Sequence, residues 1–257
     1  MKFALPLTIV LWLFITISTS VAADMRPILK HRVGTPPHQV LKIILQTNLS
    51  PALPPALPQT KMANQAPYLT WLADTDAKVE PRFILPCDSG LLYSVRNLAN
   101  QLALSLGAVD FGVRYLHTPV LLITGNSDSE TLALFLTDHK ALPTTIQTDL
   151  DHLFLPAQEI KQEQKKKTPS LPQKIVDLAE KNVDHQVAKA VERYSERIQA
   201  GRLAVIGAIL DISNHYGAGK NRLIIINING EQRPDALRRL RLTSNLPLEL
   251  KKLIGRR

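Results

Sequence analysis

The sequence has one cysteine, Cys87, among 257 residues. One cysteine cannot form a disulfide within the chain, so the fold must be held by its hydrophobic core. With 45% hydrophobic residues, the chain can build one sizeable domain. Asp88 follows Cys87 and disfavours the electropositive setting that activates a thiol. We interpret Cys87 as a lone thiol beside a turn, with a reactive thiol or an intermolecular link as the alternatives.

Familiar metal and phosphate motifs are also missing. The seven histidines form no His-x-x-His or HExxH pair, so we expect core or solvent histidines and no metal site among them. YGAGKNR (216–222) has a glycine–lysine pair without the spacing of a phosphate loop, and it predicts a hairpin turn. No internal repeat is present.

The N-terminus predicts a signal peptide over residues 1–22. A positive Lys2 precedes an apolar run over 3–17, and Ser-Val-Ala (20–22) is a small-x-small cleavage site. The run is short for a membrane span, so cleavage and export to the periplasm or the medium are expected, with an uncleaved anchor as the alternative. Residues 23–67 predict a short helix followed by a proline-rich extended arm.

Positive charge is confined to the second part of the chain. Residues 1–157 carry 11 Lys and Arg against 11 Asp and Glu, whereas residues 158–257 carry 20 against 11, which is the whole net charge of +9. This asymmetry belongs to particular segments and argues against a general nucleic-acid surface. The run QEQKKK (162–167) is interpreted as a solvated loop or helix end.

Strands alternate with helices from residue 68 to residue 230. Helical apolar spacing is found over 106–116 and again after Pro172, where Gly201 suits the C-terminal cap. This alternation predicts an α/β domain with a mostly parallel sheet flanked by helices. The predicted strands are 68–73, 91–95, 120–124, 203–210 and 223–229.

Residues 231–257 form a basic, amphipathic C-terminal segment in which leucines alternate with eight Lys and Arg residues. We interpret it as a solvated, partly helical tail. Docking on an anionic membrane surface is the alternative.

Two predicted strands end in polar turns, at Asp74–Lys78 and at Asn126–Ser129. Parallel strands deliver such turns to the carboxyl edge of the sheet, where α/β proteins place their sites. The candidate site therefore lies at these two turns.

Several segments, in this order and spacing, resemble the β-class carbonic anhydrases over roughly residues 38–230. LADTDAKVEP (72–81) is similar to the first site loop of that family, Cys-x-Asp-x-Arg, and LLYSVRNLAN (91–100) to its Arg-Asn-x-Gly-Asn turn. GAVDFGVRYLHTPVLLITGNSDS (107–129) is similar to its helix, strand and His-x-x-Cys turn, and 179–191 with 201–211 to its late helix and fourth strand. The resemblance also implies a homodimer.

In that family two cysteines and a histidine hold a zinc ion. Carried over by position, these three ligands fall on Asp74, Asn126 and Ser129, so all three are replaced. Zinc prefers thiolate and imidazole donors, and this set offers one carboxylate and two neutral side chains. We therefore expect no zinc cofactor.

Other positions of the family site are better preserved. Asp76 matches the aspartate of the family's Asp–Arg pair, Lys78 replaces its arginine, and Gln65 stands where the family keeps a glutamine that binds substrate. Asp74 and Asp76 could form an acid–base dyad in which one pKa is raised. The alternative is that Asp76 caps turn amides or pairs with Lys78 or Arg96.

Three functions follow. The first is an exported carbonic anhydrase homologue without zinc, catalytically impaired, that binds bicarbonate, another small anion or a partner. The second is an active carbonic anhydrase with a non-standard site, in which Asp74 is a ligand or base, Asp76 and Lys78 orient, and Asn126 and Ser129 bind bicarbonate. The third is an envelope-associated structural protein that acts through its basic tail.

Overall fold

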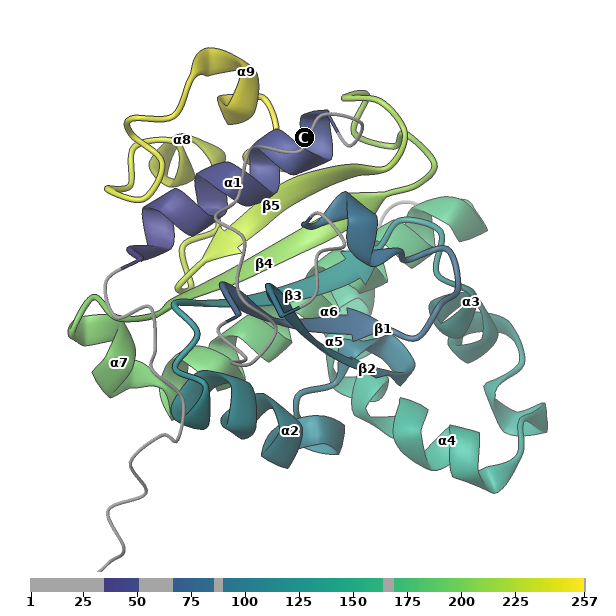
Figure 1. The fold of residues 1–257 in the computed structure, drawn as a ribbon. Coiled ribbons are helices and arrows are strands. Elements are labelled where there is room, and N and C mark those ends of the chain that lie inside the picture. Colours follow the sequence, from purple (N-terminus) through teal and green to yellow (C-terminus); the bar gives the residue numbers. More distant parts are fainter. Residues whose placement is uncertain (1–34, 51–66, 86–89, 164–168, 257) are drawn as a thin grey trace, which may run out of the picture.

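The computed structural model describes residues 35–50, 67–85, 90–163 and 169–256. They form a five-stranded sheet of order β2-β1-β3-β4-β5, parallel except for β5, which is antiparallel to β4 (Figure 1). This confirms the predicted α/β fold and mostly parallel sheet. The strands are β1 (Leu69–Asp74), β2 (Leu92–Asn97), β3 (Val120–Asn126), β4 (Ala204–Asp211) and β5 (Arg222–Ile228).

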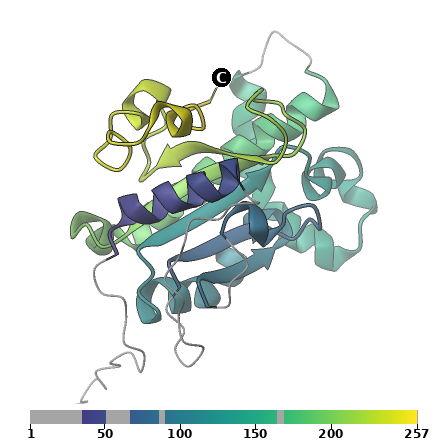
Figure 2. The same ribbon diagram turned by 45° about the horizontal axis from the view of Figure 1, so that its top comes forward.

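Helices cover both faces of this sheet. The helix α6 packs on β3 and β4, while α1, α8 and α9 lie over the opposite face beside β5 (Figures 1 and 2). The α-helices are α1 (Pro37–Leu49), α2 (Leu106–Asp110), α3 (Glu130–Thr137), α4 (Thr144–Leu150), α5 (Phe154–Glu163), α6 (Leu171–Arg193), α7 (Ser195–Gln199), α8 (Pro234–Leu237) and α9 (Leu248–Lys251).

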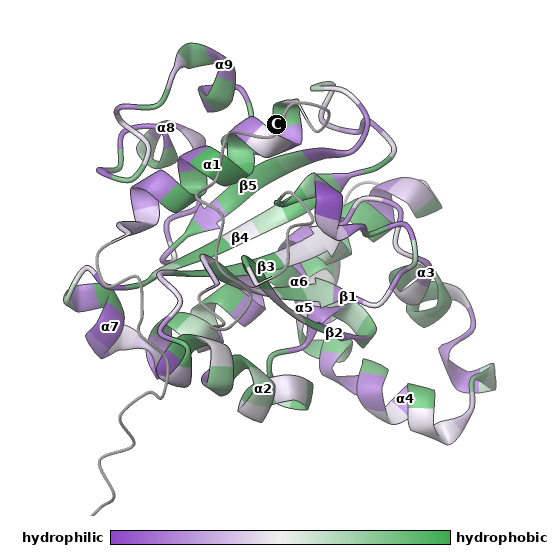
Figure 3. Ribbon diagram, in the orientation of Figure 1, coloured by the Kyte–Doolittle hydropathy of each residue, from purple (hydrophilic) through white to green (hydrophobic). Residues whose placement is uncertain are grey.

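The core is centred on β1, β3 and β4, in which every residue is buried. These strands are mainly hydrophobic, whereas α7 is mainly hydrophilic (Figure 3). Gly207 allows α6 to approach β4 closely, because a Cβ atom there would lie 2.7 Å from Val183 Cγ1. The strands are therefore fixed from both sides, and the positions of their ends are fixed with them.

The long helix predicted after Pro172 is interrupted at Tyr194. The backbone leaves helical geometry there (φ −112°, ψ 20°), and α6 ends at Arg193. Tyr194 is buried and its Oη donates to Asp110 Oδ1 at 2.9 Å. This contact ties the break to the end of α2, and Gly201 then ends α7 with φ +66°.

The prediction of a solvated C-terminal tail is wrong, and the ordered chain does not end with β5. Leu237, Leu253 and Ile254 are buried. Ile225 N donates to Leu253 O and Gly255 N donates to Ile225 O, both at 2.8 Å, so the chain end pairs with the outer edge of β5. The apolar side of the amphipathic pattern therefore packs on the domain.

Some predictions fall on residues outside the described part of the chain and stay predictions. They concern the signal peptide over 1–22, most of the arm, Cys87 and Gln65. Within the described residues, α1 covers the predicted short helix, and none of the helices combines the length and the apolarity that crossing a membrane requires.

Candidate functional site

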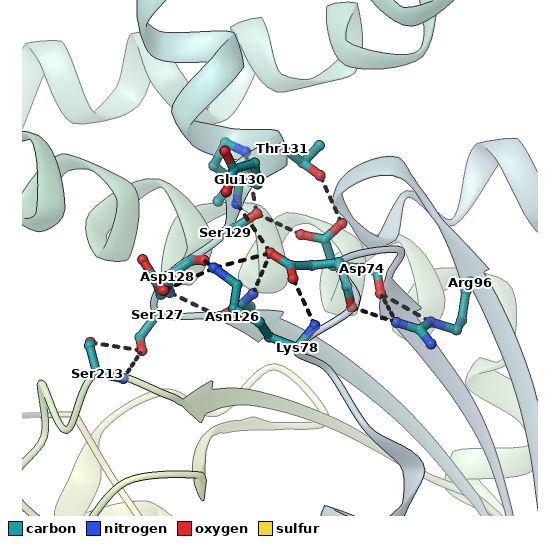
Figure 4. Close-up of polar contacts among 12 residues, drawn as sticks. Asp74, Lys78, Arg96, Asn126, Ser127, Asp128, Ser129, Glu130, Thr131 and Ser213 are labelled. Atoms are coloured by element: carbon teal, nitrogen blue, oxygen red, sulfur yellow. Dashed lines mark hydrogen bonds and ion pairs between the residues drawn. The ribbon is translucent and has the colours of Figure 1, made fainter.

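The structure brings the two predicted turns together at the carboxyl edge of the sheet (Figure 4). Strands β1 and β3 are parallel neighbours, with Ala73 opposite Thr124, so both strands end side by side at the same edge of the sheet. Ser129 then caps α3, because its Oγ accepts a hydrogen bond from Leu132 N at 3.3 Å.

Asp74 lies at the centre of this cluster, with 2% of its surface exposed. Its Oδ2 accepts from Ser129 Oγ at 2.6 Å, and its Oδ1 accepts from Thr131 Oγ1 at 3.1 Å and Ala99 N at 3.2 Å. Burial raises the pKa of this carboxyl above its ordinary value, although the three hydrogen bonds oppose the shift. Asp74 therefore has its donors supplied by the protein itself.

Asp76 caps two segments of main chain. Its Oδ1 accepts from Lys78 N at 2.9 Å, and its Oδ2 accepts from Glu130 N at the start of α3 at 3.2 Å. Asn126 Nδ2 also donates to Oδ2, at 3.2 Å. These are the capping contacts that the structural alternative for Asp76 describes.

Lys78 points mainly toward a third carboxylate. Its Nζ lies 2.9 Å from Asp128 Oδ2 and 2.8 Å from Asp128 O, and 3.7 Å from Asp76 Oδ2. Partial burial lowers the pKa of Lys78, but the hydrogen bond to Asp128 and the surrounding carboxylates outweigh it and raise the pKa. Lys78 therefore stays charged and joins the two turns.

One alternative paired the Asp76 carboxylate with Arg96. The structure does not show that pair. The Arg96 guanidinium donates to main-chain oxygens, to Asp74 O at 3.2 and 3.3 Å and to Asp76 O at 2.7 Å. It holds the backbone of the first turn in place.

Sequence reasoning missed two residues that bind Asp74. Thr131 is a polar residue in the first turn of α3, directly after the predicted turn, and this position was the available signal. Ala99 occupies the glycine position of the family's Arg-Asn-x-Gly-Asn pattern and has φ +56°, a left-handed backbone that glycine adopts more easily. The strained turn presents Ala99 N to the carboxylate.

The donors at the three ligand-equivalent positions do not fit zinc. Zinc sites are built from thiolate, imidazole and carboxylate groups, whereas Asn126 and Ser129 are neutral oxygen donors. Ser129 Oγ donates a hydrogen bond to Asp74, and Asn126 Nδ2 donates one to Asp76. No group of three or more His, Cys, Asp or Glu side chains suited to a metal occurs among the described residues.

The same contacts disfavour bicarbonate at this cluster. The donors expected to bind it, Asn126 Nδ2 and Ser129 Oγ, already serve carboxylates. Asp76 and Asp128 add negative charge next to them, and the cation between these two carboxylates, Lys78, is already paired with both. An anion would meet repulsion there and few available donors.

A family model described as carbonic anhydrase matches residues 69–218, which is more than half of the chain. Among curated proteins, none matches. The family match covers both turns of the site and ends in the β4–β5 connection.

Several solved structures with the same fold are β-carbonic anhydrases. A tetrameric enzyme from Sordaria macrospora has 20% identity and a TM-score of 0.56, over 64% of this chain and 82% of its own. CcaA has 17% identity and a TM-score of 0.54, over 64% and 81%. CafA of Aspergillus fumigatus has 22% identity and a TM-score of 0.52, over 74% and 81%.

Proposed function

This chain belongs to the carbonic anhydrase family and has the β-class fold, and we propose that it is a homologue without the family's zinc site that does not hydrate carbon dioxide through one. The proposal includes export, which the signal-peptide pattern of residues 1–22 supports. It also includes a homodimer, which the family resemblance supports. Its role is then binding of a partner, or of a small anion at a place other than the cluster around Asp74.

The observation that carries this proposal is the hydrogen bond from Ser129 Oγ to Asp74 Oδ2. Both residues stand where the family places thiolates, and here they satisfy each other. A bound zinc ion supplies hydroxide by lowering the pKa of its water, and oxygen donors engaged in hydrogen bonds do not hold such an ion tightly. The hydroxide source is therefore missing from these positions.

An active enzyme with a non-standard site is less well supported. Asp74 would have to act as a metal ligand or as a base, yet three protein donors already occupy its oxygens. Attachment to an anionic surface through residues 231–257 would rest mainly on exposed cations, because Leu237, Leu250 and Leu253 pack inward and Leu248 is the strongly exposed leucine of the segment.

Stopped-flow hydration of carbon dioxide by the purified full chain tests the proposal. We expect the rate of the buffer alone, with and without added zinc. A faster rate that disappears in the Asp74→Ala variant, but persists in Ser94→Ala, would contradict it. Ser94 is an exposed residue of the edge strand β2 and serves as the matched control.

A further inference from the structure

A cluster of cations lies at the opposite edge of the sheet from Asp74. It consists of residues in or just after the helical turn Phe111–Tyr115 that follows α2, at the end of α6, in α7 and before β4, and we call it the arginine cluster. Its members are Arg114, His117, Arg193, Arg197 and Arg202. The helix α7 lies beside the start of β4, at the end of the sheet away from α3 (Figure 1). The seven residues of β3 separate the two edges by roughly 20 Å.

Two of these arginines share one carboxylate. Arg193 Nε donates to Asp110 Oδ1 at 3.0 Å, and its Nη2 also pairs with Oδ2. Arg114 Nε donates to the same Oδ1 at 3.3 Å, and its Nη2 donates to Arg193 O at 3.2 Å. The hydrogen bond from Arg193 lowers the pKa of Asp110, so the carboxylate stays charged. These contacts hold both guanidinium groups in position, and cations near helix C-termini are in addition stabilised by the helix dipole.

Arg197 and Arg202 lack such a partner. Arg197 Nη1 lies 2.9 Å from His117 Nδ1, whereas its Nε is buried and makes no hydrogen bond. Arg202 N donates to Arg197 O at 2.9 Å, so one tight turn carries both residues. Within the described part of the chain no carboxylate forms an ion pair with either of them, although Glu192 at the end of α6 and Glu196 in α7 are near in sequence.

The surroundings of Arg197 oppose its charge. Burial is the main cause that lowers the pKa of Arg197, and the positive charges of Arg202 and Arg114 lower this pKa further. A buried donor without an acceptor is unfavourable, and the Asp110 carboxylate pairs with Arg114 and Arg193 and not with Arg197 or Arg202. The helix dipole explains Arg114 and Arg193, but it provides no acceptor for Arg197 Nε.

We propose that Arg197 and Arg202, together with His117, form a binding site for a small tetrahedral oxyanion such as inorganic phosphate or sulfate. The planar guanidinium fork matches two oxygens of such an anion, and the bound charge offsets the excess of cations. The site is independent of the zinc-equivalent cluster, so the outcome of the hydration assay does not decide it.

Calorimetric titration of the full chain with inorganic phosphate, at constant ionic strength, tests the site. We expect saturable binding to the wild type. Arg197→Gln should weaken it about tenfold or more, because charged hydrogen bonds are lost. Arg202→Gln should weaken it roughly threefold, since this exposed residue contributes mainly charge. Arg239→Gln removes one exposed arginine elsewhere and should leave binding unchanged.

Three results would overturn the proposal. They are the absence of saturation in the wild type, equal weakening by Arg239→Gln and Arg197→Gln, and binding to phosphatidylglycerol vesicles without binding to inorganic phosphate. Circular dichroism establishes that each variant is folded. If Arg197→Gln fails to fold, the titration of Arg202→Gln still tests the site, because Arg202 is exposed.

Discussion

Ser129 Oγ donates a hydrogen bond of 2.6 Å to Asp74 Oδ2, so the two residues that replace the family's thiolates bind each other. The contact joins the end of β1 to the cap of α3. In this chain the cluster at the sheet edge therefore has a structural role, which makes its energetics testable without a substrate.

Ser129→Ala should lower the free energy of unfolding by about 1–3 kcal/mol. The substitution removes both the helix cap at Leu132 N and a donor to the buried Asp74 carboxylate. Urea denaturation measures the loss. Ser94→Ala, at an exposed position, should stay within about 0.5 kcal/mol of the wild type. Equal effects of the two substitutions would show that the Ser129 contact does not stabilise the fold.

The raised pKa of Asp74 predicts how the stability of the protein depends on pH. The pKa of Asp74 in the folded protein lies above the ordinary value of 3.8, mainly because of burial. Between the two pKa values the folded state keeps a proton that the unfolded chain has released. The contribution of Asp74 to stability therefore falls as the pH rises through this window, and it stays lost above the folded pKa.

Asp74→Asn keeps the shape of the side chain and cannot ionise. The unfolding free energy of Asp74→Asn minus that of the wild type should grow as the pH rises from about 4, and then become constant. Glu180, whose pKa burial also raises, is present in both proteins and cancels. Urea denaturation over a pH series measures the difference, and parallel curves would contradict the assignment.

Ala99→Gly should stabilise the protein by up to about 1 kcal/mol, because a left-handed backbone is strained for alanine and not for glycine. Ala103→Gly is the control, since Ala103 is exposed and in a helical turn of ordinary geometry. It should destabilise by about 0.5–1 kcal/mol. Melting temperatures of the two variants should move in opposite directions, and a shared direction would refute the strain at Ala99.

Arg256 anchors the end of the chain on α6. Its guanidinium pairs with Asp184 and lies 3.4 Å from Glu180 Oε2, on the face of the sheet opposite α8 and α9. Arg256→Met leaves two largely buried carboxylates without their cation and should lower the unfolding free energy by about 2–4 kcal/mol. Arg239→Met, at an exposed arginine, should change it by less than about 0.5 kcal/mol in the same denaturation assay.

Much of the fold could be predicted from the sequence, because buried parallel strands are continuous apolar runs. Val120–Asn126 shows this best, since every side chain of β3 is buried. The convergence of Asp74, Asn126 and Ser129 was also predictable, because neighbouring parallel strands end at the same edge.

The C-terminal segment could not be predicted in the same way. Its leucines fit an amphipathic helix, but Thr243, Ser244 and Pro247 limit the structure to short helical turns. Which surface those turns cover depends on the open edge of β5, a long-range contact that local spacing does not encode. The left-handed backbone at Ala99 was hidden for a similar reason, because alanine gives no local signal for it.

Zinc content measured by elemental analysis tests the central claim most directly. The full chain is equilibrated with zinc and then dialysed, beside a variant that combines Asp74→Cys, Asn126→His and Ser129→Cys. We predict about one zinc per chain in the variant, whose ligand set suits the ion, and none retained by the wild type. One tightly held zinc per wild-type chain, lost on Asp74→Ala, would contradict the account.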